Sequence, residues 1–460
     1  AYSPEEFLNS FNRTVAKPLN PTKALVSSWK QVHFLFQLTA DEIKASSQLG
    51  LDFGSKKKVD TTIMESYLFF ALELVDRDYT RTELAVITRE INKIFNMPVM
   101  ILFRYRDTVT LAIIDRRLNK RDDTQDVLEK VTLIKDIVFA SPHRAHIEIL
   151  FDLSLTELQR QFGFTNFVEL HRAWQKALDS SELNKKFFKE LSNWYFWALQ
   201  NVTFPKDAGA DAEVRNATQC IRLITRLIFI WFIKEKRLVP DELFNQPKLQ
   251  GILKYNDPKE STYYKAILQN LFFATLNQEM NTPEKPNNRQ FRSRSKQPNG
   301  RDQHFGITNL YRYEDYFQNP AEALKLFSRI PFLNGGLFEC LDKPVKDDPT
   351  KISRLDGFSD HKDNEIRVPD FLFFSNERDV DLSQAYGVKN RVEKVRGLID
   401  ILERYKFTIN ENTPIEEEVA LDPELLGKVF ENLLASYNPE TRTTARKRTG
   451  SYYTPREIVN

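Results

Sequence analysis

Six consecutive residues near the end of the sequence combine types that can bind an anionic group. Gly-Ser-Tyr-Tyr-Thr-Pro occupies positions 450–455, and the residues after it predict a helix that begins at Pro455. The hydroxyl of Thr454 can cap a helix that starts with proline. The free amides of the first turn can then meet an anionic group such as a carboxylate. The ordinary alternative is a capped helix start that binds no ligand.

Two segments are rich in basic residues and could contact nucleic-acid phosphates. Residues 281–302 contain six basic and two acidic residues and no aliphatic ones, which gives a local charge of +4. A disordered arginine-rich segment can neutralise phosphates and become ordered on binding, whereas the alternative is a solvated surface loop. The second segment directly precedes Gly450. The predicted nucleic-acid-binding residues are Arg289, Arg292, Arg294, Lys296, Arg442, Arg446, Lys447 and Arg448.

Acidic residues of the first third could hold a divalent cation in a nuclease. Such sites need an aspartate close to a Glu-x-Lys triplet, because two carboxylates hold the cation while the lysine steadies the attacking water or the phosphate. Residues 42–44, Glu-Ile-Lys, match the triplet, but residues 1–40 contain no aspartate. A looser set, which would need a divergent active site, consists of Asp107, Asp115, Glu129, Lys130 and Lys135.

Composition excludes several other kinds of site. The 460 residues include 14 glycines and no Gly-x-Gly, so a complete dinucleotide or Walker loop is not expected within them. The two cysteines and six scattered histidines offer no zinc or disulfide framework, and we expect no metal ligand set. His143 and His146 could face a site together, although a pair at a strand entry is the alternative.

Net charge and hydropathy limit how the protein can bind nucleic acid or a membrane. The formal charge is +2, so a nucleic-acid surface must be regional. The most apolar run, residues 227–233, is too short to span a bilayer and predicts a buried helix, so we expect no membrane partner. Cysteine usage and the absence of a signal-like first segment lead us to expect a cytoplasmic protein.

Two kinds of structure are expected to position these residues, and together they predict an α+β fold. Residues 1–153 form an α/β N-terminal domain with helices at 61–75 and 80–94 and strands at 99–105, 108–115, 131–139 and 145–153. We expect a small, mainly antiparallel sheet with helices on one face.

The rest of the sequence has mostly helical periodicity. We expect a helical connector domain at 154–280, a basic flexible loop at 281–305, and a helical domain at 306–460 that contains a helix at 423–435. Ile221, Ile224, Ile228 and Phe232 recur at helical spacing, as one buried face requires.

Three segments resemble one family. PFLNGGLFE at 331–339, YKFTINENTPIEEEVALDPELLG at 405–427 and GSYYTP at 450–455 are similar to the approach to the catalytic domain of adenine-specific (N6) DNA methyltransferases of the type IIG restriction-modification group. The modification subunits of type I systems share the Gly-x-x-Tyr-Thr-Pro element. This resemblance implies S-adenosylmethionine as cofactor, bordered by Tyr453, Thr454 and Pro455, and double-stranded DNA as partner.

The sequence also departs from that family. Its glycine-rich cofactor loop and its catalytic (Asn/Asp/Ser)-Pro-Pro-(Tyr/Phe) tetrapeptide are absent, because the three Asn-Pro pairs continue as Thr-Lys, Ala-Glu and Glu-Thr. A methyltransferase without its donor loop and base-holding residues cannot methylate a flipped base. We therefore assign no catalytic residue here and expect an N-terminal fragment of a longer enzyme, which contributes DNA binding or positioning and the first element of the cofactor pocket.

Two alternatives remain open. One is a metal-dependent DNA endonuclease domain of the same restriction-modification system, which would use Mg²⁺. The other is a non-catalytic scaffold that holds the methyltransferase to a partner subunit.

Overall fold

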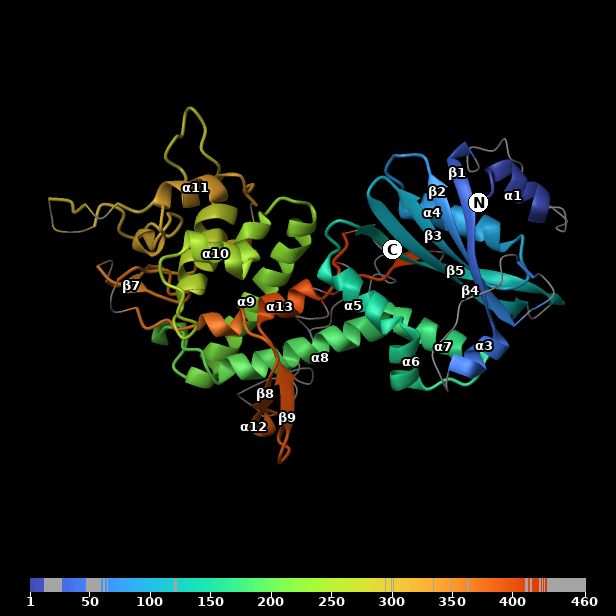
Figure 1. Ribbon diagram of the computed structural model, residues 1–460. Coiled ribbons are helices and arrows are strands. Elements are labelled where there is room, and N and C mark those ends of the chain that lie inside the picture. The colour runs from blue at the N-terminus through green and yellow to red at the C-terminus, as the bar shows by residue number, and fades with distance from the viewer. Residues whose placement is uncertain are drawn as a thin grey trace. The chain divides into compact units, whose positions relative to one another are not determined.

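The computed structural model forms two compact units (Figure 1). It describes residues 1–11, 27–46, 59–60, 63, 65–119, 122–293, 295–298, 300, 302–333, 335–348, 350–361, 364–409, 413, 416–421, 423, 425 and 427. The first unit comprises residues 1–186 and 404–422, and the second comprises residues 187–403 and 423–460. The first unit thus continues past the expected boundary at residue 153, and the finer subdivision of the remaining chain stays a prediction.

A six-stranded mixed sheet is the centre of the first unit. The strands follow the order β1 (Trp29–Thr39), β2 (Ser66–Leu74), β3 (Val99–Tyr105), β4 (Thr108–Asn119), β5 (Asp122–Val138) and β10 (Glu416–Glu418). The pairs β1–β2, β3–β4 and β4–β5 are antiparallel, whereas β2–β3 and β5–β10 are parallel. The predicted α+β class and mainly antiparallel sheet are therefore confirmed.

Helices cover both faces of this sheet, not one face as expected. One face packs against α1 (Pro4–Phe11) and α4 (Arg81–Asn92). The other packs against α3 (Ala40–Ser46), α5 (Arg144–Asp152), α6 (Leu155–Phe162) and α7 (Phe167–Leu178). Successive side chains of β5 alternate between the two cores, with Leu133 in the first and Ile134 in the second.

Two predicted elements have the opposite secondary structure. The helix expected at 61–75 is wrong, because residues 66–74 form β2, most of whose side chains are buried. Since both faces of a central strand are covered, β2 lacks the alternating polar pattern that marks a half-exposed strand. The strand expected at 145–153 is helix α5, which buries Ala145, His146 and Ile149 on one face.

Other local predictions are confirmed. The helix expected at 80–94 is α4, and the structure adds that it begins with a capping box between Thr80 and Glu83. Strands β3 and β4 form the expected hairpin through Arg106, whose φ of 48° is the left-handed value that a tight turn needs.

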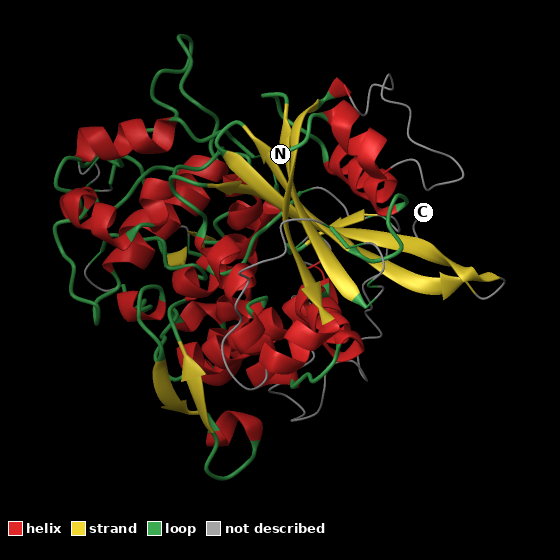
Figure 2. Cartoon of the chain, turned by 45° about the vertical axis from the view of Figure 1, so that its right-hand side comes forward, coloured by secondary structure: helices red, strands yellow, loops and turns green. Residues whose placement is uncertain are grey.

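The second unit is mainly helical and carries two small hairpins (Figure 2). The hairpins pair β6 (Lys343–Pro344) with β7 (Ile352–Ser353), and β8 (Arg378–Asp381) with β9 (Val392–Val395). Helix α8 (Ser180–Leu199) starts in the first unit and continues in the second. The other α-helices and the π-helix η4 are α9 (Ala212–Glu235), α10 (Gln246–Ile252), η4 (Tyr263–Leu276), α11 (Pro320–Ser328), α12 (Ser383–Tyr386) and α13 (Leu398–Glu403). The short 3-10 helices are η2 (Lys206–Ala208), η3 (Asp241–Phe244), η5 (Glu314–Tyr316), η6 (Gly336–Phe338) and η7 (Asp370–Leu372).

Helix α9 lies in the core of the second unit. Ile221, Ile224, Ile228 and Phe232 are all buried, as their spacing predicts. Within the described residues, α9 alone is long and apolar enough to cross a membrane, but 72% of its most apolar stretch is buried inside the protein. Such burial is typical of a core helix. Most of the helix predicted at 423–435 lies outside the described residues.

Candidate functional site

The residues predicted to border the cofactor lie beyond the part of the chain that the structure describes. These are Tyr453, Thr454 and Pro455. The basic residues Arg442, Arg446, Lys447 and Arg448 and, in the earlier segment, Arg294 also fall outside the described ranges. Among the predicted site residues, the structure therefore describes Arg289, Arg292 and Lys296 in the second unit, and the residues considered for a nuclease in the first unit.

Arg289 is buried inside the second unit instead of facing solvent as expected. Only 5% of its surface is exposed, and its guanidinium donates to the carbonyl oxygens of Thr275, Gln278, Phe327 and Ile330 at 2.6–3.3 Å. These carbonyls belong to the ends of η4 and α11 and the turns after them, where helices leave carbonyls unsatisfied and favour a cation. Burial lowers the pKa of Arg289. Its geometry is that of a structural clamp, not a phosphate contact.

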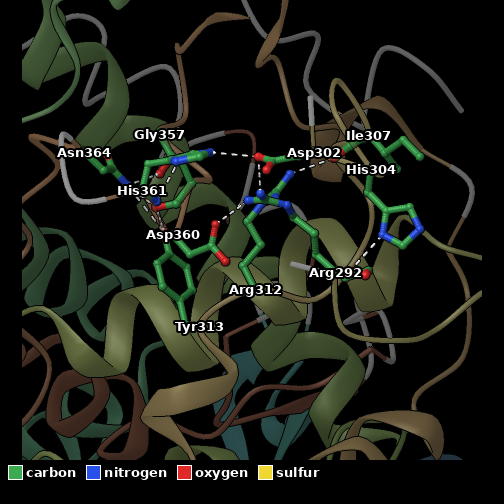
Figure 3. Close-up of polar contacts among 12 residues, drawn as sticks. Arg292, Asp302, His304, Ile307, Arg312, Tyr313, Gly357, Asp360, His361 and Asn364 are labelled. Atoms are coloured by element: carbon green, nitrogen blue, oxygen red, sulfur yellow. Dashed lines mark hydrogen bonds and ion pairs between the residues drawn. The ribbon is translucent and has the colours of Figure 1, made fainter. Parts of the chain in front are cut away.

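Arg292 is likewise engaged within the protein, at the centre of a polar cluster (Figure 3). Its Nη1 lies 2.5 Å from Oδ1 of Asp360, and its Nη2 pairs with Asp302. Its side chain is 8% exposed, so both ion pairs are largely shielded from water. Lys296, by contrast, is exposed. The structure therefore brings Arg289 and Arg292 inward and leaves Lys296 on the surface.

Further polar side chains hold the segment that carries Asp360. The Tyr313 hydroxyl donates toward Oε1 of Gln269 and the carbonyl of Ser359, both at 2.9 Å. Nδ2 of Asn364 donates to the carbonyls of Gly357 and Ser359 at 2.9 and 2.6 Å. Burial raises the pKa of Tyr313 well above its ordinary value, so this hydroxyl stays protonated and can keep donating.

A cavity of about 30 Å³ opens beside Arg292. Its charged and titratable lining includes Asp302, His304, Arg312, Arg354 and His361. Nδ1 of His304 accepts the backbone N–H of Ser293 at 3.0 Å. Sequence reasoning missed Arg312, Arg354 and His361 as site residues, because they come from separate segments and share no local motif.

One group of three side chains in the second unit has the spacing of a metal site. Among the described residues, Cys340, Asp342 and Asp356 offer ligand atoms within 4.8 Å of one another. Asp342 accepts the backbone N–H groups of residues 356, 357 and 358 at 2.7–3.2 Å. Asp356 lies 3.2 Å from Nη1 of Arg226 and accepts the Leu341 N–H at 2.8 Å. Both carboxylates therefore have hydrogen-bonding partners within the protein, and these contacts hold the loops around them in place.

Arg226 also holds the short turn that follows the first residue of the glycine pair at 335–336. The side chain is 2% exposed and donates to the carbonyls of Leu337 and Glu339 at 2.8 and 3.2 Å. Both carbonyls lie in or directly after η6, the short turn that Gly336 begins. The segment 331–339 is thereby tied to the core helix α9.

Of the residues considered for a nuclease, Glu42, Lys130 and Lys135 contact other partners in the described structure. Glu42 accepts the N–H and hydroxyl of Thr39, both at 2.8 Å, at the start of α3. Lys130 pairs with Glu417, and Lys135 pairs with Asp136. The side chains of Asp115 and Glu129 lie outside the described part of the structure.

The first unit contains a larger cavity beside one of these pairs. It measures about 270 Å³ and is lined by Lys130 and Glu417 together with Tyr67, His171 and Trp174. The rings of Tyr67 and Trp174 meet edge to face, with centroids 4.7 Å apart. An aromatic wall and a partly buried ion pair suit a small polar ligand, and Asp179 adds a second carboxylate to the described lining.

His143 and His146 begin helix α5 and have different roles. Nδ1 of His143 accepts the N–H of Ala145 at 3.1 Å and caps the helix. His146 is 3% exposed, and neither of its ring nitrogens has a hydrogen-bond partner. The expected pair at a strand entry is thus a pair at a helix start.

Comparison with known proteins gives one informative similarity. The chain is 30% identical over 303 residues to a protein of Methanocaldococcus jannaschii that is named as a candidate type II restriction enzyme and methyltransferase. The match covers 65% of this chain but 17% of that protein, so the chain spans a small part of its relative's length. No protein-family model matches the chain, and no solved structure matches it.

Proposed function

We propose that the chain is part of an S-adenosylmethionine-dependent DNA adenine N6-methyltransferase of a type IIG restriction-modification system. In this enzyme it binds and positions double-stranded DNA and supplies the first element of the cofactor pocket at Tyr453, Thr454 and Pro455. The observation that carries the proposal is the similarity, over 303 residues, to a protein whose name joins restriction and methylation. The Gly-x-x-Tyr-Thr-Pro element at 450–455 supports it independently.

The DNA contacts are assigned to Lys296, which is exposed, and to five basic residues that lie outside the described residues. These five are Arg294, Arg442, Arg446, Lys447 and Arg448. Arg289 and Arg292 are set apart from this group, because carbonyls and carboxylates already satisfy their guanidinium groups. Exposed cations are available to replace the counterions of a DNA backbone, whereas buried cations with internal partners are not.

Methyl transfer by the full-length protein tests the enzymatic assignment. Labelled S-adenosylmethionine and DNA are incubated with the protein, and the nucleosides are separated after digestion; label in N6-methyladenine is expected. Thr454→Ala is expected to raise the KM for the cofactor by about tenfold, the cost of about one hydrogen bond. Thr443→Ala is the matched control. The assignment is refuted if label appears in no base, or in cytosine alone.

Salt dependence tests the DNA contacts separately. The double variant Arg294→Gln/Lys296→Gln is expected to reduce the slope of log affinity against log salt by about 2, because each lost phosphate contact removes about one unit. Lys206→Gln is the control, since Lys206 is highly exposed but lies elsewhere in the second unit. An unchanged slope in the double variant removes the earlier segment from the DNA interface.

A further inference from the structure

One wall of the cavity beside Arg292 is a buried guanidinium that lacks a carboxylate partner. Arg312 is 7% exposed, and within the described residues it forms no ion pair. Its Nη2 donates to the carbonyl of Ile307 at 2.7 Å, and its guanidinium lies 5.0 Å from the ring centroid of Phe358. Its Nε is buried and has no hydrogen-bond partner. Buried charges are otherwise paired, because removing a charge from water is costly.

The carboxylates around this cavity are already committed to other groups. Asp302 and Asp360 both pair with Arg292, which lies beside Arg312 in the same cluster (Figure 3). Asp342, which also lines the cavity, accepts three backbone N–H groups. Arg312 is therefore a buried guanidinium that the charge of Asp360 influences but that no carboxylate contacts as an ion pair in the described cluster.

The remaining lining suits a small anion. Arg354 follows β7 and adds a second guanidinium to the cavity wall. His361 lies at the rim with 49% of its side chain exposed, and its Nε2 is 3.5 Å from Oδ2 of Asp302. A volume of about 30 Å³ admits one or two oxygen-sized atoms but not a nucleobase. A ligand must therefore insert one or two oxygen atoms, such as those of a phosphate whose remaining atoms stay outside the cavity.

We propose that this cavity binds a phosphate group, with Arg312 and Arg354 as its ligands. The planar fork of a guanidinium donates two parallel hydrogen bonds to an oxyanion, and Arg312 has unused donors for them. The phosphate comes either from a DNA backbone or from free inorganic phosphate. The DNA source rests on the proposed function, whereas binding of inorganic phosphate does not depend on it.

Inorganic phosphate alone provides the first test. The intact chain is titrated with phosphate at constant ionic strength in a calorimeter, with chloride as the reference anion, and one site per chain is expected. Arg354→Gln is expected to weaken phosphate binding by about tenfold, since one charge-assisted contact is lost. Arg391→Gln is the control, because Arg391 lies on the hairpin that includes β9 and pairs with Glu393 away from the cavity lining.

Arg312→Lys provides a second variant, which keeps the positive charge so that the chain is expected to fold. Its circular dichroism spectrum is expected to match that of the unaltered chain, and its phosphate affinity is expected to fall because a lysine cannot form the fork. If phosphate affinity is equal in the unaltered chain, Arg354→Gln and folded Arg312→Lys, the proposal is overturned and the cavity holds water only.

A DNA arm distinguishes the source of the phosphate. Fluorescence anisotropy of a labelled duplex is measured with and without inorganic phosphate. Competition, together with weaker DNA binding by Arg354→Gln, identifies a backbone phosphate as the ligand. If neither inorganic phosphate nor Arg354→Gln alters DNA binding, while the unaltered chain still binds inorganic phosphate, the ligand of the cavity is the free anion. Methyl transfer is scored independently, so failure of the enzymatic assignment does not affect the inorganic phosphate result.

Discussion

Burial of His146 predicts that the first unit loses stability in mild acid. The imidazole is 3% exposed, and neither ring nitrogen has a partner that would stabilise the charged form. Burial first, and then the positive charge of Lys406 and the nearby His143, lowers the pKa of His146 from 6.5 to about 4, against a small opposing effect of Asp136. Protonation of this residue is therefore much harder in the folded chain than in the unfolded one.

The sign and size of the effect follow from these two pKa values. Below pH 6.5 the unfolded chain binds a proton at this residue while the folded chain does not, so the free energy of unfolding falls as the pH falls. The loss between pH 8 and pH 5 is about 2 kcal/mol, and it approaches about 3 kcal/mol near pH 4. The contribution of the neutral, buried His146 to stability is fully present above the unfolded-state pKa of 6.5. It is lost as the pH falls from 6.5 to the folded-state pKa of about 4.

Replacement of the imidazole checks this reasoning. Urea unfolding at pH 8 and pH 5 is compared for the unaltered chain and His146→Phe, and the variant is expected to lack about 2 kcal/mol of the acid-induced loss. Hydrogen exchange of the α5 amides, corrected for intrinsic rates, assigns the effect to this helix. His146→Gln serves as a second variant in case the larger ring disturbs packing.

His33→Gln is the matched control, since His33 is a half-buried histidine elsewhere in the same unit. The reasoning is refuted if His146→Phe and His146→Gln lose the same free energy between pH 8 and pH 5 as the unaltered chain does.

Three further substitutions, one of them with a matched control, probe the fold. Arg289→Met is expected to lower the free energy of unfolding by about 3–5 kcal/mol in urea titrations, because several carbonyls lose their donor; a stable variant with a reduced salt slope for DNA would contradict the clamp. Gly397→Ala should cost about 2–4 kcal/mol, since an added Cβ lies 2.2 Å from the Phe373 carbonyl oxygen, whereas Gly251→Ala meets nothing within 4 Å and should be neutral or stabilising. Thr80→Ala should lower the thermal midpoint by the equivalent of about 1 kcal/mol, because the capping box of α4 is lost; an unchanged midpoint would speak against that box.

The elements that sequence predicts correctly are those whose signals are local. The capping box and apolar spacing of α4 lie within one helix, and the β3–β4 hairpin follows from two apolar runs separated by Arg106 and Asp107. The same holds for the buried face of α9, whose period of three and four residues needs no knowledge of its neighbours. The resemblance of residues 450–455 to a cofactor-binding element is also a property of sequence alone.

The tertiary structure decided the rest, because the deciding partners are distant in sequence. Strand β2 is buried on both faces by helices before and after it, which removes the polar alternation that identifies a strand. Charge alone suggested that Arg289 and Arg292 face solvent. In the structure, Arg289 is buried because it donates to carbonyls at helix ends, the last of them at residue 330. Arg292 is buried because it pairs with Asp302 and Asp360. A buried guanidinium needs acceptors for its donors, and here these acceptors are brought close only by the tertiary fold.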